Sequence, residues 1–337
     1  MPVIALINGA AAGGSADRAA AFRRGLRETG YVEGQNLMVE YHWLDSQYDR
    51  VPALMADLVR RRVSVIATPA STIAAIAAKA VTATIPIVFG VGNDPVKVGL
   101  VASLARPAGN ATGINFFVTE VTAKRLALLH ELVPKAVRVA VLVNPANTSP
   151  DSPFRDVQEA ARTIGLQIQV LNAGTIGEIN TAFATFVRER PDALFVMPDP
   201  FFTDRRVQLA NLAARERIPA AYAQRVSVEV GGLMSYGTDL ADMFRQVGVY
   251  TGRILKGAKP ADLPVVQSTK FEFIINLQTA KLLGIDVPET LLATAERFRR
   301  GLGSATAWSL AAWAQRSELP VVAYLYPGIP LSAEPLL

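Results

Sequence analysis

The same succession of apolar strands and amphipathic helices occurs twice in this chain, and this duplication constrains the fold more than any other feature. The first succession begins with the apolar stretch 2–8 and the second with 137–143. Each opens with a strand ending near an asparagine, then small residues, a serine, a helix and a glycine. Each later contains an Ile-Pro pair before a short strand with an aromatic residue. Strands that alternate with helices predict parallel sheets with helices on both faces.

The spacing of apolar residues places the elements of each half. In the first half we expect strands at 2–8, 37–43, 63–67, 86–89 and 111–117, with helices over 16–29 and 48–62 and an alanine-rich helix ending near Val81. In the second half we expect strands at 137–143, 166–171, 193–197, 219–222 and 230–236, with helices over 119–132, 153–164, 176–188 and 204–216. The chain is therefore predicted to be an α/β protein with two doubly wound, Rossmann-like lobes.

The chain is predicted to cross between the lobes three times, forming a three-strand hinge. The long helix 239–255 follows the second lobe but would complete the helical layer of the first. We expect residues 1–117 and 239–265 in lobe 1, and 118–238 and 266–296 in lobe 2. The crossings are expected near 116–118, 235–238 and 265–270. Three connections restrict the relative motion of the lobes to opening and closing of a cleft.

Short polar side chains follow the predicted strands where each strand ends. In open α/β sheets, ligands bind outside the carboxyl ends of the strands. The stretch 86–115 is predicted to supply half of such a site, because a glycine-studded loop follows its apolar strand. Neutral hydrogen-bonding groups among aromatic side chains favour a small, partly apolar ligand. The candidate ligand-binding residues are Asn8, Ser71, Thr72, Gly90, Asn93, Asp94, Asn144, Thr148, Asp199, Phe201, Tyr222 and Tyr236.

Charged groups of a ligand would have partners in this set. Ser71 and Thr72 stand at a helix start, where free N–H groups would accept a carboxylate. Asp94 or Asp199 would pair with an ammonium group. Structural roles stay open beside these: Ser71 as a plain N-cap, Asp199 as the cap of a helix beginning near Thr203, and part of the aromatic residues as core.

The composition excludes several classes of protein. The chain has no cysteine, which excludes disulfides, thiolate metal sites and a cysteine nucleophile. Its two histidines, His42 and His130, favour neither a metal centre nor acid–base catalysis, and we expect no cofactor. The net charge is +5, but Lys and Arg are scattered, so a nucleic-acid partner is not expected. No apolar run reaches the roughly 18–20 residues of a membrane helix.

Enzyme signatures are missing or weak. The segment Gly232 to Gly237 has the wrong spacing for a nucleophile elbow, and neither a Walker A motif nor GxGxxG occurs. Gly13-Gly14 before a helix is only a weak phosphate-binding signal. An enzyme with two Rossmann-like lobes acting on a nucleotide sugar remains the alternative, and it would need a phosphate-binding loop and a placed acid or base. A ligand-sensing regulator would need a DNA-binding helix-turn-helix before the first strand.

Motifs distributed along the chain resemble one protein family. They are Asp94-Pro95-Val96, Gly99-Leu100-Val101, Ser103 to Pro107, Gly109 to Gly113, Phe22 to Leu26, Gly30 to Asn36, Ile85 to Phe89 and Ala280 to Pro288. Together, over roughly residues 2–295, they resemble the solute-binding proteins of ABC transporters of the tryptophan/tyrosine-binding type, which have a type I periplasmic-binding fold. The resemblance implies a non-enzymatic, exported, periplasmic protein that delivers an aromatic amino acid or related small molecule to an ABC transporter permease. We expect a monomer.

The end of the chain departs from this family pattern. Residues 299–315 contain a twin arginine, a short apolar stretch and a small-residue end, the layout of an export signal, whereas no signal peptide precedes Pro2. Residues 319–325 then echo residues 1–7. Our hypothesis is that 297–337 is the start of a second, similar protein. The alternative is an amphipathic closing helix followed by a strand at a sheet edge.

Overall fold

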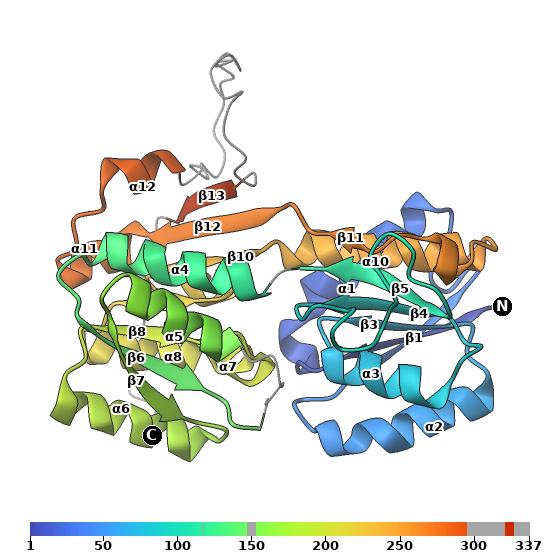
Figure 1. Cartoon of the computed structure of the whole chain (residues 1–337), viewed down its shortest axis with the longest axis horizontal. Coiled ribbons are helices and arrows are strands. Elements are labelled where there is room, and N and C mark those ends of the chain that lie inside the picture. The colour runs from blue at the N-terminus through green and yellow to red at the C-terminus, as the bar shows by residue number, and fades with distance from the viewer. Residues whose placement is uncertain (117, 147–152, 295–320, 327–337) are drawn as a thin grey trace, which may run out of the picture.

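The computed structural model describes residues 1–116, 118–146, 153–294 and 321–326, which form two α/β halves, each built on one sheet (Figure 1). The strand order is β11-β5-β4-β3-β1-β2 in the first sheet and β13-β12-β10-β9-β8-β6-β7 in the second. In the described residues the strand pairs are parallel except for β10 with β12. The predicted fold class of two doubly wound lobes is confirmed.

The first sheet is covered by helices on both faces. Its strands are β1 (Val3–Asn8), β2 (Met38–Trp43), β3 (Val65–Pro69), β4 (Ile87–Val91), β5 (Ala111–Asn115) and β11 (Val266–Gln267). Its helices are α1 (Ala16–Glu28), α2 (Val51–Arg61), α3 (Thr72–Val81) and α10 (Leu240–Leu255), with short 3₁₀ turns at Ala12–Gly14, Tyr48–Arg50 and Pro260–Asp262. Strands buried on both faces read as continuous apolar runs rather than alternating ones, as in β3 and β4.

The second sheet has the same construction. Its strands are β6 (Arg138–Val143), β7 (Gln167–Asn172), β8 (Ala193–Val196), β9 (Ala220–Tyr222), β10 (Met234–Thr238), β12 (Phe271–Asn276) and β13 (Val321–Tyr326). Its helices are α4 (Val118–Leu132), α5 (Pro153–Thr163), α6 (Ile176–Glu189), α7 (Pro200–Asp204), α8 (Arg206–Arg215), α9 (Arg225–Glu229), α11 (Leu277–Leu283) and α12 (Glu289–Thr294). The helix expected over 204–216 is α8, and a separate short helix, α7, precedes it, because Arg205 leaves the helical conformation between them.

The duplication extends to individual side chains. The order β2-β1-β3-β4-β5 in one sheet corresponds to β7-β6-β8-β9-β10 in the other. Asn8 at the end of β1 and Asn144 after β6 make the same turn. The side-chain oxygen of Asn8 accepts the N–H of Ala10 at 2.9 Å, and that of Asn144 accepts the N–H of Ala146 at 3.0 Å. Equivalent loops of the two halves therefore begin with the same local hydrogen bond.

Helix α10 follows the second half in sequence but packs on α1 of the first, as Figure 1 shows. Glycines allow this close approach: a Cβ on Gly25 would meet the backbone carbonyl of Arg245, and one on Gly248 would meet that of Phe22. The expected boundary between residues 265 and 266 needs a correction. Strand β11 pairs with β5 and so extends the first sheet by two residues, since its backbone completes the edge of that sheet.

Three backbone segments connect the halves and lie side by side at the junction. They are joined by hydrogen bonds from Thr238 Oγ1 to Phe116 O (2.8 Å), from Ser268 N to Asn115 O (2.8 Å) and from Asp239 N to Lys270 O (3.0 Å). Because each segment is bonded to another, they form one connected hinge rather than three independent linkers.

The C-terminal segment is described only at residues 321–326. These form β13, which pairs in parallel with β12 along the outer edge of the second sheet. The export-signal layout at 299–315 lies outside the described residues. An edge strand, part of the structural alternative, is thus present at 321–326, and descent from a second copy stays a hypothesis.

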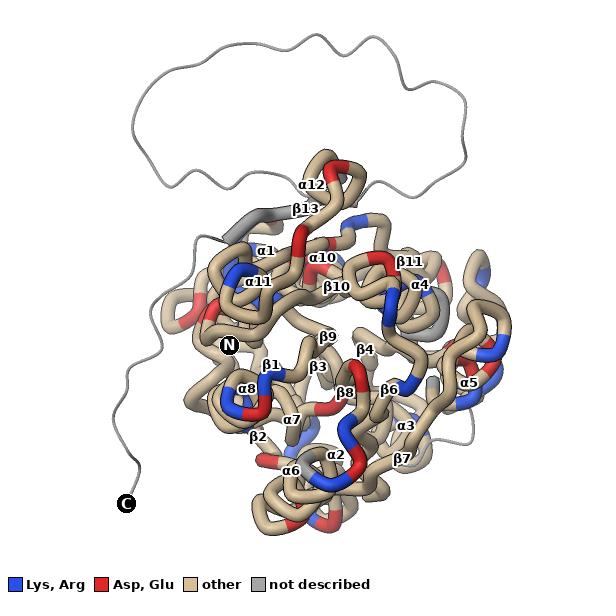
Figure 2. The backbone as a smooth tube through the Cα atoms, turned by 90° about the vertical axis from the view of Figure 1, so that its left-hand side faces the viewer, with Lys and Arg blue, Asp and Glu red and all other residues tan. Residues whose placement is uncertain are grey.

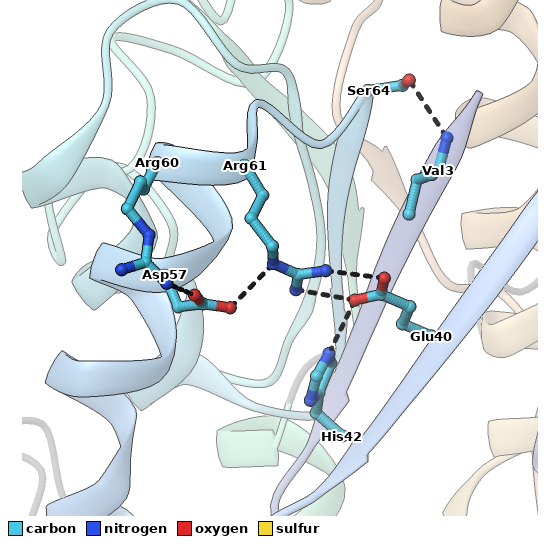
Figure 3. A network of polar contacts seen from close by, with 7 residues as sticks. All are labelled: Val3, Glu40, His42, Asp57, Arg60, Arg61 and Ser64. Atoms are coloured by element: carbon cyan, nitrogen blue, oxygen red, sulfur yellow. Dashed lines mark hydrogen bonds and ion pairs between the residues drawn. The ribbon is translucent and has the colours of Figure 1, made fainter. Parts of the chain in front are cut away.

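Charged residues of both signs are interleaved on the outer helices around α5, α6 and α8 (Figure 2). Figure 3 shows one surface network, in which Arg61 bonds both carboxylate oxygens of Glu40 at 2.8 Å and reaches Asp57 at 2.7 Å. The hydrogen bond from Arg61 lowers the pKa of Glu40. His42 Nε2 lies 3.4 Å from a carboxylate oxygen of Glu40, so His42 belongs to this surface network on the edge strand β2.

Among the described residues, no helix has the length and apolar character to cross a membrane.

Candidate functional site

A cavity of about 300 Å³ lies between the two halves, at the carboxyl ends of the parallel strands. Its walls come from the loops after β1, β3 and β4, from the loops after β6, β8, β9 and β10, and from residues of α1, α3, α4 and α10. This is the small end of the range for ligand pockets, ~300–1,000 Å³. The volume suits a molecule of amino-acid size.

Six residues predicted from the sequence line this cavity: Asn8, Ser71, Thr72, Asn93, Asn144 and Asp199. They come from equivalent loops of the two halves. Thr72 donates its hydroxyl to the side-chain oxygen of Asn93 at 3.0 Å, and Asn144 donates to Asp199 Oδ1 at 3.1 Å. Hydrogen bonds between lining residues therefore fix the positions of these polar side chains.

Two of these residues also hold helix starts, as the structural alternatives proposed. Ser71 accepts the N–H of Ala74 at 3.4 Å and caps α3. Asp199 accepts the N–H of Phe201 at 2.8 Å and caps α7. This helix begins at Pro200, three residues earlier than the expected start near Thr203. Each residue both caps a helix and faces the cavity.

Two predicted residues of the first half do not line the cavity. Gly90 belongs to β4, which extends to Val91, and a Cβ at Gly90 would meet the sulfur of Met243. A larger residue at this position would have to displace the Met243 side chain of α10. Asp94 Oδ1 accepts the N–H groups of Val96 and Lys97 at 2.9 and 3.3 Å, so its carboxylate stabilises the loop itself.

Three predicted aromatic residues of the second half are not among the lining residues either. Tyr222 and Tyr236 are buried in the packed core of their sheet. Phe201 packs against Phe202, and its ring lies 5.6 Å from the guanidinium of Arg205. Thr148 lies outside the described residues.

The structure adds lining residues that the sequence analysis did not single out. The apolar wall consists of Ile73, Ile76, Phe116, Val121, Val143, Met197 and Leu240, and the polar additions include Arg18, Tyr48, Thr122, Arg125 and Gln224. The site thus combines an apolar surface with two cationic side chains, those of Arg18 and Arg125. Neither arginine was among the candidate residues.

Arg125 of α4 is the most unusual of these residues, because only 1% of it is exposed. Its Nη1 donates to the carbonyl of Tyr236 at 3.3 Å, and its guanidinium lies 4.6 Å from the ring centroid of Phe195. Nε and Nη2 have no hydrogen-bond partner among the described residues. Burial lowers the pKa of Arg125 to about 9.

Contacts across the cavity join the two halves. The N–H of Ala11 donates to Asp204 Oδ2 at 3.0 Å, and Arg18 Nη2 donates to the side-chain oxygen of Gln224. Burial lowers the pKa of Arg18 and raises that of Asp204, while their opposite charges act against both shifts. These contacts bridge the two halves beside the cavity.

Two doubly wound lobes, a three-segment hinge and a cleft at the strand ends define a type I periplasmic-binding protein. The chain belongs to the ABC transporter substrate binding protein family, which matches residues 3–299. It is therefore the substrate-binding protein of an ABC transporter and not an enzyme, which removes the nucleotide-sugar alternative.

Relatives extend the comparison. A tyrosine-binding protein of Clostridioides difficile (strain R20291) is 27% identical over 262 residues, covering 78% of this chain and 75% of that one. A conserved domain protein of Vibrio cholerae is 25% identical with a TM-score of 0.79, covering 87% of this chain and 97% of that one. An ABC domain of Streptococcus pneumoniae, solved in complex with L-Trp, is 24% identical with a TM-score of 0.77 and the same coverage.

Proposed function

We propose that this protein captures a small carboxylate-bearing molecule, an aromatic amino acid or a close relative, and delivers it to the permease of an ABC importer. The observation that carries the proposal is the cavity of about 300 Å³ between the lobes, with apolar walls, short polar groups and two arginines. An apolar pocket with a few convergent polar groups fixes both the size and the orientation of a small ligand.

The relative with the matching ligand class supports this assignment. The tyrosine-binding protein of Clostridioides difficile shares 27% of its residues with this chain over the aligned region. An aromatic ring would lie against the apolar wall of Ile73, Ile76 and Phe116, and the amino-acid group would face the polar residues.

Delivery depends on closure of the cleft. In this proposal the lobes, 1–117 with 239–267 and 118–238 with 268–296, open and close about the hinge. A ligand that contacts both lobes stabilises the closed state and shifts the population towards it. The closed form is the signal to the permease, and the protein acts as a monomer in the periplasm.

A binding screen on the purified protein tests this function. Calorimetry and thermal-shift measurements would use L-tyrosine, L-tryptophan, L-phenylalanine, 3-phenylpropionate and, as unrelated probes, nucleotide sugars. We expect at least one aromatic acid to bind and to raise the melting temperature; at ~100 times its Kd it adds about 2.7 kcal/mol. Stabilisation by nucleotide sugars alone, or by none of these probes, would contradict the proposal.

A pair of matched variants locates the site. Ile76→Glu places a charged carboxylate on the apolar wall where the aromatic ring would lie, and is expected to weaken binding because the charge would lose solvation. Ile176→Glu makes the same change at an exposed position of α6 outside the cavity lining, and binding should be unchanged. Equal effects of the two variants would contradict binding in this cleft.

A further inference from the structure

Arg125 lies on the face of α4 that packs into the protein. It is four residues after Val121 and four before Leu129, and both of those side chains are buried. Side chains spaced by four residues share one face of a helix, so the guanidinium is carried into the interior. It ends at the cavity, whose lining includes it.

The guanidinium is held in a defined orientation with one edge unused. The carbonyl of Tyr236 accepts from Nη1, and the Phe195 ring packs against the guanidinium plane. Nε and Nη2 form the opposite edge of the fork, and neither has a partner among the described residues. Two parallel N–H groups on one edge match the two oxygens of a carboxylate.

The described protein supplies no anion to Arg125. Burial alone accounts for its lowered pKa, without a contribution from any acidic side chain. A buried charge without a counter-charge is costly, so buried charges in proteins are normally paired, and an anionic group of a ligand would supply the pair here.

The other charged residues of the cavity are already engaged. Arg18 bonds to Gln224 and is attracted by Asp204, and Asp199 accepts from Asn144 and from the N–H of Phe201. Among the described lining residues the formal charge is two arginines against one aspartate. With Asp204 attracting Arg18 from outside the lining, Arg125 is the arginine that has no acidic partner among the described residues.

We propose that Arg125 anchors the ligand's carboxylate through Nε and Nη2, so that the protein selects molecules with a free carboxylate over their amides, esters and amines. This inference rests on the proposed function and deepens it. It places the carboxylate on the second lobe, at α4, instead of at the start of α3 as the sequence analysis expected.

The test combines an Arg125→Met variant with matched probes. L-tyrosine is compared with L-tyrosinamide, and 3-phenylpropionate with 3-phenylpropionamide, by calorimetry. We expect the unchanged protein to prefer each acid by about a hundredfold or more, since truncating one partner of a buried charge pair has effects of that order. In Arg125→Met the acid and the amide should bind with equal, weak affinity.

A second readout separates anchoring from a structural role. Replacing an uncompensated buried charge by an apolar side chain is often neutral or stabilising, so ligand-free Arg125→Met should melt at the same or a higher temperature. The ligand-induced rise in melting temperature with 3-phenylpropionate should disappear. Arg253→Met, whose guanidinium lies over the Tyr250 ring and outside the cavity lining, is the control and should keep that rise.

The outcomes distinguish the inference from the function beneath it. If the unchanged protein binds the acids and Arg125→Met keeps the same preference for acid over amide, the anchor is wrong while the proposed function stands. A lower melting temperature of Arg125→Met with the ligand-induced rise intact would also overturn the anchor. If the unchanged protein binds no aromatic acid or amide, both proposals fall.

Discussion

The backbone N–H of Ala11 donates to Asp204 Oδ2 at 3.0 Å, and this bond crosses the cleft from the loop after β1 to the end of α7. Arg18 and Gln224 make a second contact between the halves beside it. Both contacts require the lobes to be close together. If the lobes open and close as proposed, opening breaks both contacts, so they favour the closed state.

Removing the carboxylate of Asp204 should shift this balance towards the open state. We expect Asp204→Ala to weaken ligand affinity by about tenfold, because hydrogen bonds to charged groups contribute roughly 1.5–3 kcal/mol. The loss should appear mainly as faster dissociation, measured by stopped-flow fluorescence. Asp192→Ala is the control, since Asp192 accepts the N–H groups of Val137 and Arg138 away from the cleft. Similar dissociation rates for Asp204→Ala and the unchanged protein would show that this contact does not hold the cleft closed.

Arg125 predicts a pH limit to binding. Burial lowers its pKa to about 9, so the cation is lost at a lower pH than for an exposed arginine. The affinity for 3-phenylpropionate, which does not titrate in this range, should fall as the pH rises through about 9. Calorimetry between pH 7 and 10 measures the effect. An affinity that stays constant to pH 10 would contradict the prediction.

Glu272 of β12 predicts a pH dependence of stability. Burial, reinforced by Asp239 and opposed by Arg225, raises its pKa to about 7, and only 19% of its side chain is exposed. The folded state thus binds this proton more tightly than the unfolded chain. Its stabilising contribution is complete below about pH 4.5 and is lost as the pH rises through about 7. The loss is at most about 3 kcal/mol, at 1.36 kcal/mol per pKa unit.

A substitution isolates this contribution. Glu272→Gln cannot ionise, so urea unfolding at pH 5 and pH 8 should show a smaller decline than in the unchanged protein. Glu178→Gln is the control, because hydrogen bonds from the N–H groups of Gly174 and Thr175 lower the pKa of Glu178, so it stays ionised over this pH range and the decline should be unchanged. If Glu272→Gln loses as much unfolding free energy between pH 5 and pH 8 as the unchanged protein, a group other than Glu272 causes the pH dependence.

Most of the fold follows from periodicity, and the reason is physical. Strands such as β3 and β4 are covered by helices on both faces, so their sequences are continuous apolar runs between polar turns. The two halves also repeat their turn residues, as Asn8 and Asn144 show. What the pattern did not resolve were boundaries set by pairing, such as β11 at the edge of the first sheet.

The site was predictable where it depends on strand ends and not where it depends on helix faces. Asn8, Asn93 and Asn144 follow strands, and that position brings them to the cavity. Arg125 sits inside a helix, so no loop marks it. A signal was nevertheless present, since Arg125 occupies an apolar stripe, and Arg18 stands four residues before the buried Phe22 in the same way. A cation on the buried face of a helix needs an anionic partner, and this reasoning would have added both arginines to the candidate residues.

Close packing of α1 on α10 predicts a strong effect at Gly25. A Cβ there would overlap the backbone carbonyl of Arg245, which cannot move without moving α10. Gly25→Ala should therefore destabilise the protein by about 1–3 kcal/mol in urea unfolding. Gly177→Ala on α6, where nothing lies within 4 Å, is the matched control and should be neutral or stabilise by up to about 1 kcal/mol. Equal stabilities of the two variants would mean that α1 and α10 can move apart to accommodate the added methyl group at little cost.

The C-terminal segment should be dispensable for binding. Every described residue that lines the cavity falls between Asn8 and Leu240, and β12 keeps its antiparallel pairing with β10 without β13. A chain ending at residue 296 should bind 3-phenylpropionate as tightly as the full chain. It should be somewhat less stable and more prone to associate, because the edge of β12 is then unpaired.

A milder variant separates loss of the strand from loss of the segment. In Ala323→Pro the backbone N–H at that position is absent, which weakens the pairing in register with Phe273 while keeping the chain length. We expect unchanged affinity by calorimetry and faster cleavage of the segment by protease. A tenfold loss of affinity in the shortened chain, with its melting temperature preserved, would show that the segment contributes to the cleft. That result would also contradict its origin as the start of a second copy, because such a remnant would have no place in the binding site of the first.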